Sequence, residues 1–256
     1  MALKTVLCFA AAAMAASITI PPALGQEHAR VYELRTYTYY EGKLPFLLAN
    51  FRDHHRHVFE KHGITNIAYW VPQDSPAHEN TLIYVLAHAS REAAKKNWDE
   101  FFKDPEFLKV AKDSEAQGKI VIKVESVFMD PTDFSPATPP AGAPEHPRVF
   151  ELRTYHCNEG KLPDLLARFR NHTMGIFEKH GVNNIAYWVP QDAPAHENTL
   201  IYVIAHPSRD AAKQHWKEFG GDPEWQKVQK ESEANGKIVS KLESVFMDPT
   251  DFSPMK

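Results

Sequence analysis

Two Glu–Arg pairs occur on segments rich in β-forming residues. Glu33 and Arg35 form the first pair, and Glu151 and Arg153 form the second. Residues two positions apart lie on the same face of a strand. A guanidinium on such a face can hold a carboxylate, an enolate or a phosphate with two parallel hydrogen bonds. These pairs are the strongest candidates for a binding or catalytic site, with Arg35 and Arg153 as candidate catalytic residues.

The same charges also have a structural explanation, because paired buried charges commonly stabilise a fold without catalysing a reaction. In that case Arg35 would pair across the sheet with Glu125, and Arg153 with Glu243. The residue pattern is compatible with both explanations.

Aromatic hydroxyls recur on the same strands in both halves of the chain. They could line a ligand cavity beside the arginines, although aromatic side chains on strands more often form plain core. The candidate ligand-binding tyrosines are Tyr37, Tyr69, Tyr84, Tyr155, Tyr187 and Tyr202.

One histidine ends a predicted strand in each half, at His88 and His206. Imidazole changes its charge near neutral pH and is a common general acid or base. These side chains could reach the mouth of a barrel, and they are candidate catalytic groups. A hydrogen-bonded histidine at a strand end is an equally good explanation.

A histidine-rich segment at residues 54–57 suggests metal binding, and His54 and His57 could share one ion. The ligand set is incomplete, because only Asp53 lies beside them as a further donor. The matching segment of the second half keeps only His172 of this cluster. We therefore expect no metal site, with His54 and His57 as weak candidates.

The chain contains one internal repeat of domain size. Residues 30–136 align without insertion with residues 148–254, and most aligned residues are identical. Each copy predicts four strands, which in the first copy lie at 31–38, 64–71, 81–88 and 119–129, with helices after the first and third strands. This βαββαβ order is that of the ferredoxin-like unit, an α+β fold with both helices on one sheet face.

The alternation of side chains along each strand predicts what the two sheet faces carry. In the first strand, Tyr32 and Leu34 are expected to face the helices, whereas Glu33, Arg35 and Tyr37 face the other way. Two copies can pack these second faces together. We therefore expect a pseudo-two-fold dimeric α/β barrel within one chain, with the charged and phenolic side chains lining its interior.

Composition and the N-terminal segment limit the function classes. With 29 basic and 33 acidic residues the net charge is −4, so a nucleic-acid partner is not expected. Residues 1–25 are typical of a signal peptide, which predicts a periplasmic or secreted protein with no stable membrane insertion after cleavage. The predicted domains are 28–136 and 148–254, joined by a Pro-rich linker at 137–147.

Several motifs of the first copy resemble those of the NIPSNAP family. They are Tyr32-Glu33-Leu34-Arg35-Thr36-Tyr37, Glu41-Gly42-Lys43, Phe59-Glu60-Lys61-His62-Gly63, Tyr69-Trp70 and Asp104-Pro105-Glu106-Phe107, and the second copy repeats them. The resemblance covers nearly all of the expected mature chain and implies a dimeric α/β-barrel fold. It also implies relatedness to small monooxygenases, haem-degrading enzymes and isomerases, whereas the activity of the family is largely uncharacterised. An export signal and two complete repeats suggest an exported bacterial-type member.

Three functions are compatible with these features. The first is a small-molecule-binding barrel, and the second is a cofactor-free or haem-dependent monooxygenase-like or isomerase-like enzyme. The third is a protein-interaction module that uses the helix faces and the loops at 72–80. No cofactor is expected as the default, with haem or a metal as the alternative. The pseudo-dimeric chain could also form a homo-oligomer.

Overall fold

The structure is a computed structural model and describes residues 30–116, 118–136 and 148–256. The signal peptide expected at 1–25 and the linker expected at 137–147 lie outside these ranges.

The first copy follows the predicted βαββαβ order. Two features were not predicted: a π-helical turn, η1, inside the first helix, and a short helix, α3, in the predicted loop. The elements are β1 (Val31–Tyr39), α1 (Leu44–Asn50), η1 (Phe51–His55), α2 (Arg56–Lys61), β2 (Thr65–Pro72), α3 (Ala77–Asn80), β3 (Thr81–His88), α4 (Arg91–Phe101), α5 (Pro105–Glu115) and β4 (Val121–Pro131).

The second copy repeats this order element for element, which is the structural consequence of the gap-free alignment. Its elements are β5 (Val149–Cys157), α6 (Leu162–Arg168), η2 (Phe169–Thr173), α7 (Met174–Lys179), β6 (Asn183–Pro190), α8 (Ala195–Asn198), β7 (Thr199–His206), α9 (Arg209–Gly221), α10 (Pro223–Ser232) and β8 (Val239–Pro249).

Local signals in the sequence explain where the helices begin and end. The Ser90 hydroxyl accepts a hydrogen bond from the Ala93 amide at the start of α4, and Asp104 caps α5 through the Glu106 amide. Gly63 follows α2 with φ of +74°, a left-handed conformation that glycine adopts without strain.

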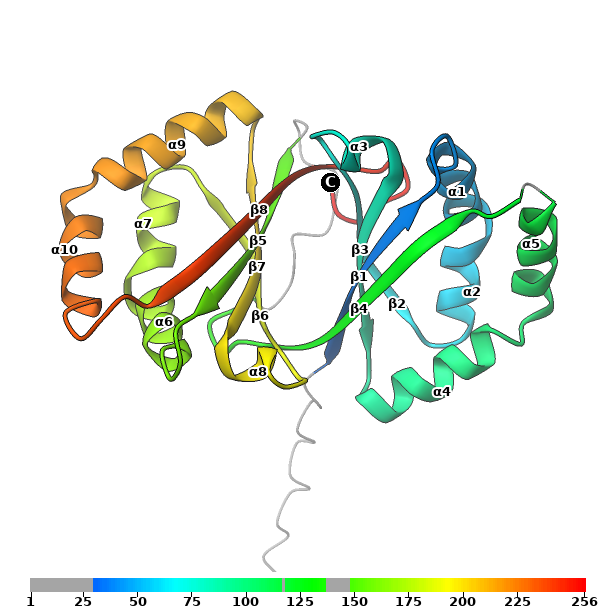
Figure 1. Cartoon of the computed structure of the whole chain (residues 1–256), viewed down its shortest axis with the longest axis horizontal. Coiled ribbons are helices and arrows are strands. Elements are labelled where there is room, and N and C mark those ends of the chain that lie inside the picture. Colours follow the sequence, from blue (N-terminus) through cyan, green and yellow to red (C-terminus); the bar gives the residue numbers. More distant parts are fainter. Residues whose placement is uncertain (1–29, 117, 137–147) are drawn as a thin grey trace, which may run out of the picture.

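The eight strands close into one antiparallel barrel in the order β1-β3-β2-β8-β5-β7-β6-β4. Each copy contributes four neighbouring strands, and the copies join where β2 pairs with β8 and β4 pairs with β6. The longer helices lie on the two outer sides, with the strands between them (Figure 1). The predicted pseudo-dimeric α/β barrel is therefore confirmed.

The predicted assignment of the two sheet faces is wrong. The barrel interior holds a continuous apolar core from both copies that includes Leu34, Trp70, Met129 and Leu152. Tyr32 packs against the same core. The charged and phenolic side chains instead lie between the sheet and the helices. The interior of a closed barrel is shielded from water on all sides, whereas the helices can supply hydrogen-bond partners to the outer face.

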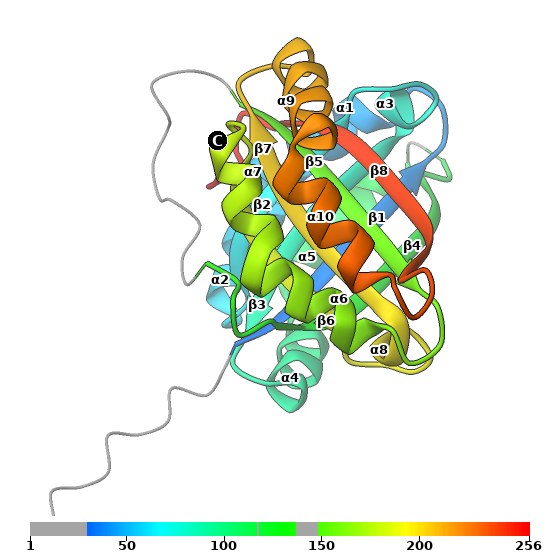
Figure 2. The same ribbon diagram turned by 90° about the vertical axis from the view of Figure 1, so that its left-hand side faces the viewer.

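Helices cover the outer face of the second copy, where α9 and α10 lie over β5 and β7 (Figure 2). The apolar core on this side includes Leu165, Phe169, Phe177 and Tyr202. The first copy has an equivalent core beneath its own helices.

The segment after the last strand of each copy packs beneath the other copy. Phe252, which follows β8, lies in the helix-side core of the first copy with its ring centroid 5.3 Å from that of Tyr69. Phe134, which follows β4, contacts Tyr187 in the same way at 5.5 Å. Each copy therefore completes the core of its neighbour.

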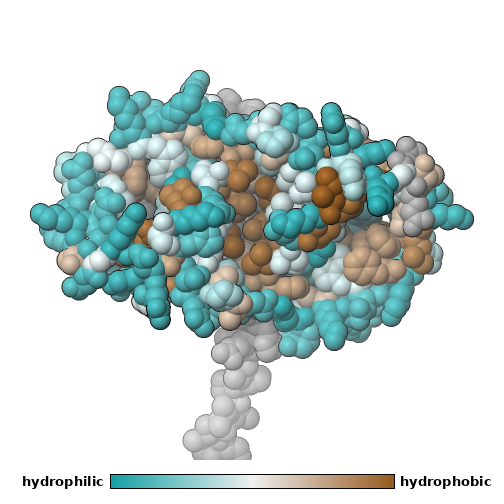
Figure 3. Space-filling model, in the orientation of Figure 1, coloured by the Kyte–Doolittle hydropathy of each residue, from teal (hydrophilic) through white to brown (hydrophobic). Residues whose placement is uncertain are grey.

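Hydrophobic surface gathers in the middle of one face, where the two copies meet (Figure 3). The large hydrophobic side chains with the greatest exposure are Tyr40, Phe102, Leu108, Val121, Ile122, Val124 and Leu242. No helix in the described part of the chain is long and apolar enough to cross a membrane.

Candidate functional site

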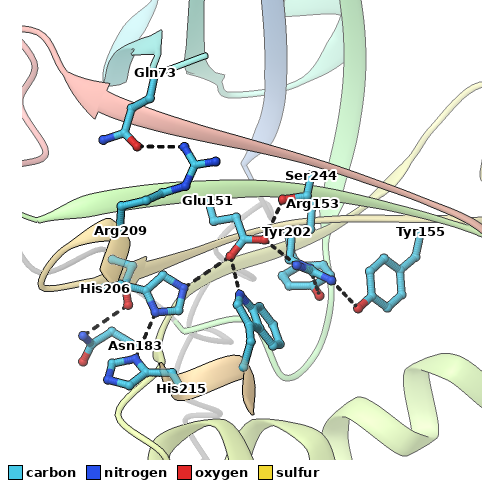
Figure 4. A network of polar contacts seen from close by, with 12 residues as sticks. Gln73, Glu151, Arg153, Tyr155, Asn183, Tyr202, His206, Arg209, His215 and Ser244 are labelled. Atoms are coloured by element: carbon cyan, nitrogen blue, oxygen red, sulfur yellow. Dashed lines mark hydrogen bonds and ion pairs between the residues drawn. The ribbon is translucent and has the colours of Figure 1, made fainter. Parts of the chain in front are cut away.

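A buried ionic network forms around Glu151 in the second copy (Figure 4). The Arg153 guanidinium donates from Nη1 to the Glu151 carboxylate, from Nε to the Tyr202 hydroxyl at 2.8 Å, and from Nη2 to the Tyr155 hydroxyl at 3.1 Å. Its Cζ atom lies 4.3 Å from the ring centroid of Trp216 on α9. Arg153 is thus held by its own strand, a neighbouring strand and a helix.

The Glu151 carboxylate accepts hydrogen bonds from four side chains. Besides Arg153, its partners are Ser244 at 2.6 Å, Trp216 at 2.9 Å and His206 at 3.3 Å. Burial alone would raise the pKa of Glu151, but these partners together lower it to about 2. A carboxylate that is ionised and already has four donors has little capacity to accept a proton from a substrate.

The first copy contains the same network. Arg35 donates to Glu33 at 2.5 Å, to Tyr84 at 3.0 Å and to Tyr37 at 3.0 Å. Glu33 also accepts from His88, Trp98 and Ser126, and its pKa is likewise lowered to about 2, against the effect of burial.

The arginines therefore pair with glutamates on their own strands, and the predicted pairing across the sheet is wrong. Glu125 is opposite Thr36 in the strand register, so it lies on the other sheet face from Arg35. It is exposed and pairs with Lys123 at 2.7 Å. Glu243 occupies the equivalent position and pairs with Lys241.

Of the two explanations for His88 and His206, the position at a barrel mouth is wrong, and the hydrogen-bonded histidine at a strand end is confirmed. Both side chains are fully buried on the helix side, and each contacts the glutamate of its network through Nε2. Because that glutamate only accepts hydrogen bonds, Nε2 must carry the hydrogen. In the second copy, His206 Nδ1 also contacts Nδ1 of His215 at 3.1 Å.

The remaining candidate tyrosines lie next to these networks. Tyr69 stacks on Tyr84 with ring centroids 5.2 Å apart, and Tyr187 stacks on Tyr202 at 5.1 Å. The Tyr69 and Tyr187 hydroxyls donate to the side chains of Asn66 and Asn184. The structure thus brings the predicted tyrosines together with the arginines, but outside the barrel interior.

A cavity of about 270 Å³ opens beside the second network, between β8 and the helices. Tyr155 is the member of the network that lines it. The walls combine aromatic rings with a few polar and charged groups. The lining residues are Tyr155, Arg168, Phe169, Thr173, Phe177, Phe219, Trp225, Gln229, Glu233, Lys237, Val239, Ser240, Lys241 and Leu242.

The π-helical turn η2 (Phe169–Thr173) supplies part of this wall. Such single turns inside α-helices occur frequently at functional sites. Arg168, which precedes the turn, was not among the predicted site residues. The only signal for it in the sequence is the replacement of Asn50 in the first copy by Arg168 in the second.

Comparison with known proteins places this architecture in a family. The family model described as NIPSNAP matches residues 32–136 and 150–254. The chain belongs to the NIPSNAP family. The family predicted from the sequence motifs is therefore confirmed, with one NIPSNAP domain in each copy of the repeat.

Several solved structures are similar to this chain at low sequence identity. A proposed monooxygenase from Lactobacillus acidophilus is 10% identical with a TM-score of 0.56, and the alignment covers 86% of this chain and 94% of that chain. An anthrone oxidase-like protein is 11% identical with a TM-score of 0.50, covering 90% and 95%. A NIPSNAP family protein from Agrobacterium tumefaciens is 23% identical with a TM-score of 0.40, covering 45% and 96%. No match was found among curated proteins.

The first NIPSNAP domain has a larger side chain at one position that lines the cavity in the second domain. His55 takes the place of Thr173 and packs among aromatic rings, with centroids 4.8 Å from Phe51 and 5.8 Å from Phe107. Its Nε2 atom is buried without a hydrogen-bond partner among the described residues. Burial, and then the neighbouring His54, lower the pKa of His55 to about 4.

The histidine cluster does not form a ligand set in the described part of this NIPSNAP chain. His54 Nδ1 contacts Glu106 on α5 at 3.1 Å, and His57 is exposed. No group of three or more His, Cys, Asp or Glu side chains suited to a metal ion occurs among the described residues.

Proposed function

We propose that the second NIPSNAP domain binds a small, largely apolar organic molecule in the cavity beside Tyr155. The observation that carries this proposal is an aromatic-walled space of about 270 Å³ that meets a fixed polar group. Ligand sites generally combine apolar walls with a few precisely placed polar groups, and pockets for drug-sized ligands measure about 300–1,000 Å³. The volume suits a molecule of one or two rings.

Tyr155 is the polar anchor of this proposed site. Its hydroxyl oxygen accepts a hydrogen bond from Arg153 Nη2 at 3.1 Å, so its own hydrogen is available to a ligand acceptor. The arginine is fixed by Glu151, Tyr202 and Trp216, and it therefore holds Tyr155 in place. Arg153 and Glu151 are positioning residues in this account, because neither lines the cavity.

The second candidate function is an oxygenase or isomerase reaction without a cofactor. It is supported by the Tyr155 hydroxyl, which is polarised by Arg153 and could stabilise an oxyanion that develops on a bound phenol or enol. Proteins named as a proposed monooxygenase and as anthrone oxidase-like share the fold. Oxygen uptake or isomerisation by the bound ligand would distinguish this function from binding alone.

A haem-dependent reaction does not fit the cavity. Its lining contains no histidine, cysteine or methionine side chain to serve as an axial ligand, and the hydroxyl oxygen of its one tyrosine, Tyr155, already accepts a hydrogen bond from Arg153.

The proposed cellular site is the periplasm or the exterior of the cell, as expected for an exported bacterial-type NIPSNAP protein. The support is the signal-like composition of residues 1–25 alone. Fractionation of the native host and N-terminal sequencing of the mature chain would test this location.

The binding proposal can be tested with 2-naphthol, a neutral two-ring probe, in ligand-observed NMR. The variant Thr173→His introduces the residue that packs among the rings of the first domain. We expect it to weaken 2-naphthol binding by about tenfold or more, which corresponds to about 1.4 kcal/mol. The matched control is His55→Thr in the first domain, which should leave binding at the second domain unchanged. Equal binding by the wild type and Thr173→His, or no binding by the wild type, would overturn the proposal.

A further inference from the structure

Arg168 is a buried cation whose hydrogen-bonding capacity is poorly used. The residue is 6% exposed and lines the cavity of the second domain. Its Nη1 atom contacts Ser232 Oγ at 3.2 Å and Glu233 Oε1 at 3.4 Å, and its Nε atom is buried with no hydrogen-bond partner among the described residues. Charge-assisted bonds are normally about 2.7–2.9 Å long. The Glu233 contact is therefore weak for an ion pair.

Other arginines of the second domain form more hydrogen bonds, or shorter ones, than Arg168 does. Arg153 donates to three side chains, and the exposed Arg170 forms a bidentate pair with Asp133 at 2.6 and 2.8 Å. A buried charge is costly unless it is paired and hydrogen-bonded. The cost of burying the Arg168 charge is therefore only partly offset by its partners, and because the residue lies in the wall of a cavity, an anion bound there could offset the rest.

The first domain lacks this cation, although it retains the surrounding structure. Its aligned residue, Asn50, donates to Ser114 at 3.2 Å, and Ser114 aligns with Ser232. The charge is therefore not needed to hold the first helix of the repeat against the last one.

The remaining walls indicate what kind of anion would fit. The Arg168 Cζ atom lies 5.3 Å from the ring centroid of Trp225, and the Phe219 and Trp225 centroids are 4.4 Å apart. Lys237 and Lys241 are further cations in the lining, of which Lys241 is paired with Glu243, and Glu233 is the single acidic residue of the lining. A planar carboxylate matches the two-nitrogen edge of a guanidinium, and an aromatic ring matches the adjacent wall.

We propose that the cavity of the second domain selects an aromatic carboxylate, whose carboxylate group is bound by Arg168. This inference rests on the proposed function and names the ligand class for the same cavity. The ligand carboxylate takes the role that Glu233 fills weakly from 3.4 Å. The ring lies against Trp225 and Phe219, and Tyr155 contacts a further polar group of the ligand.

The test compares two probes of nearly equal size, 2-naphthoate and 2-naphthol. We expect the wild type to bind 2-naphthoate about tenfold more tightly, because hydrogen bonds to charged groups exceed neutral ones by about that factor. The variant Arg168→Asn, which has the residue of the first domain, should lose this preference and keep its affinity for 2-naphthol. The control Arg170→Gln removes an exposed cation of the same helix and should leave both affinities unchanged.

Two further variants keep the test decisive if Arg168→Asn folds poorly. Arg168→Lys keeps the charge but loses the two-nitrogen edge, so it should retain only part of the preference. Glu233→Gln removes the competing carboxylate and should tighten 2-naphthoate binding several-fold without changing 2-naphthol binding. Equal binding of the two probes by the wild type, or a full preference in Arg168→Asn, would overturn the carboxylate assignment alone. Failure of both probes to bind would overturn the proposed function itself.

Discussion

At the scale of single residues, two of the differences between the NIPSNAP domains at the cavity bear directly on the proposed site. Thr173 in the second domain is replaced by His55 in the first, and Arg168 is replaced by Asn50. His55 lies among aromatic rings with an Nε2 atom that has no partner among the described residues, and burial lowers its pKa to about 4. The first domain therefore contains a neutral imidazole in the position where the second has open space.

This environment makes the free energy of unfolding depend on pH through His55. The folded protein keeps the imidazole neutral, whereas the unfolded chain binds a proton below a pKa of about 6.5. The stability contributed by the neutral form is therefore present above pH 6.5 and is lost as the pH falls towards 4. Between pH 7 and pH 5 the loss is about 2 kcal/mol from this group. We expect the free energy of unfolding to fall less for His55→Phe than for the wild type when the pH is lowered from 7 to 5.

Urea unfolding at pH 7, 6 and 5 would measure this difference. The exposed His57 provides the control, since His57→Ala should keep the pH slope of the wild type. An unchanged slope in His55→Phe would show that the imidazole is accessible to protons in the folded state.

At the scale of elements, the segments after β4 and β8 exchange contacts between the domains. The Tyr69 amide donates to Ser253 Oγ at 2.9 Å, and the Thr250 amide donates to the Tyr69 carbonyl at 2.9 Å. The Phe252 ring then fills a place in the core of the first domain, where 7% of the residue remains exposed.

We expect Phe252→Ala to lower the unfolding free energy by about 3 kcal/mol, because it leaves a cavity beside Tyr69 that the strands cannot fill. The measurement is chemical denaturation of the full chain. Asp251→Asn, next to it, removes only an exposed ion pair with Arg52 and should change stability very little. A small effect of Phe252→Ala would mean that the segment contributes little to the core of the first domain.

At the scale of the whole molecule, neither domain can bury its inner sheet face alone. The interior core draws on both domains, and the sheet of the first domain ends at β2 and β4, whose outer edges pair only with strands of the second. A separate domain would expose two strand edges and an apolar face.

We therefore expect residues 30–136, produced alone, to form a dimer with a second copy of themselves. The near-identity of the repeats allows one domain to occupy the place of the other. Native mass spectrometry or light scattering should give twice the mass of the single domain. A stable, folded monomer would show that the interior core is not needed for folding.

The sequence by itself determined the repeat, the order of elements and the family, because these follow from identity between the copies, from side-chain periodicity and from turn residues. It also identified Glu33 and Arg35, and the equivalent Glu151 and Arg153, as candidate site residues. Which sheet face points inward was decided only by the tertiary structure. Both faces of these strands are buried, so alternation separates Leu34 from Arg35 but does not indicate which of them meets the helices.

The tertiary structure also determined which residues pair with the arginines and where the cavity lies. Arg153 pairs with Glu151 and not with Glu243, because the register places Glu243 on the opposite sheet face. The importance of Arg168 could not be predicted from its position in a helix. It depends on how closely α6 and α10 pack and on which atoms remain without partners there, and packing of this kind is specified by distant residues acting together.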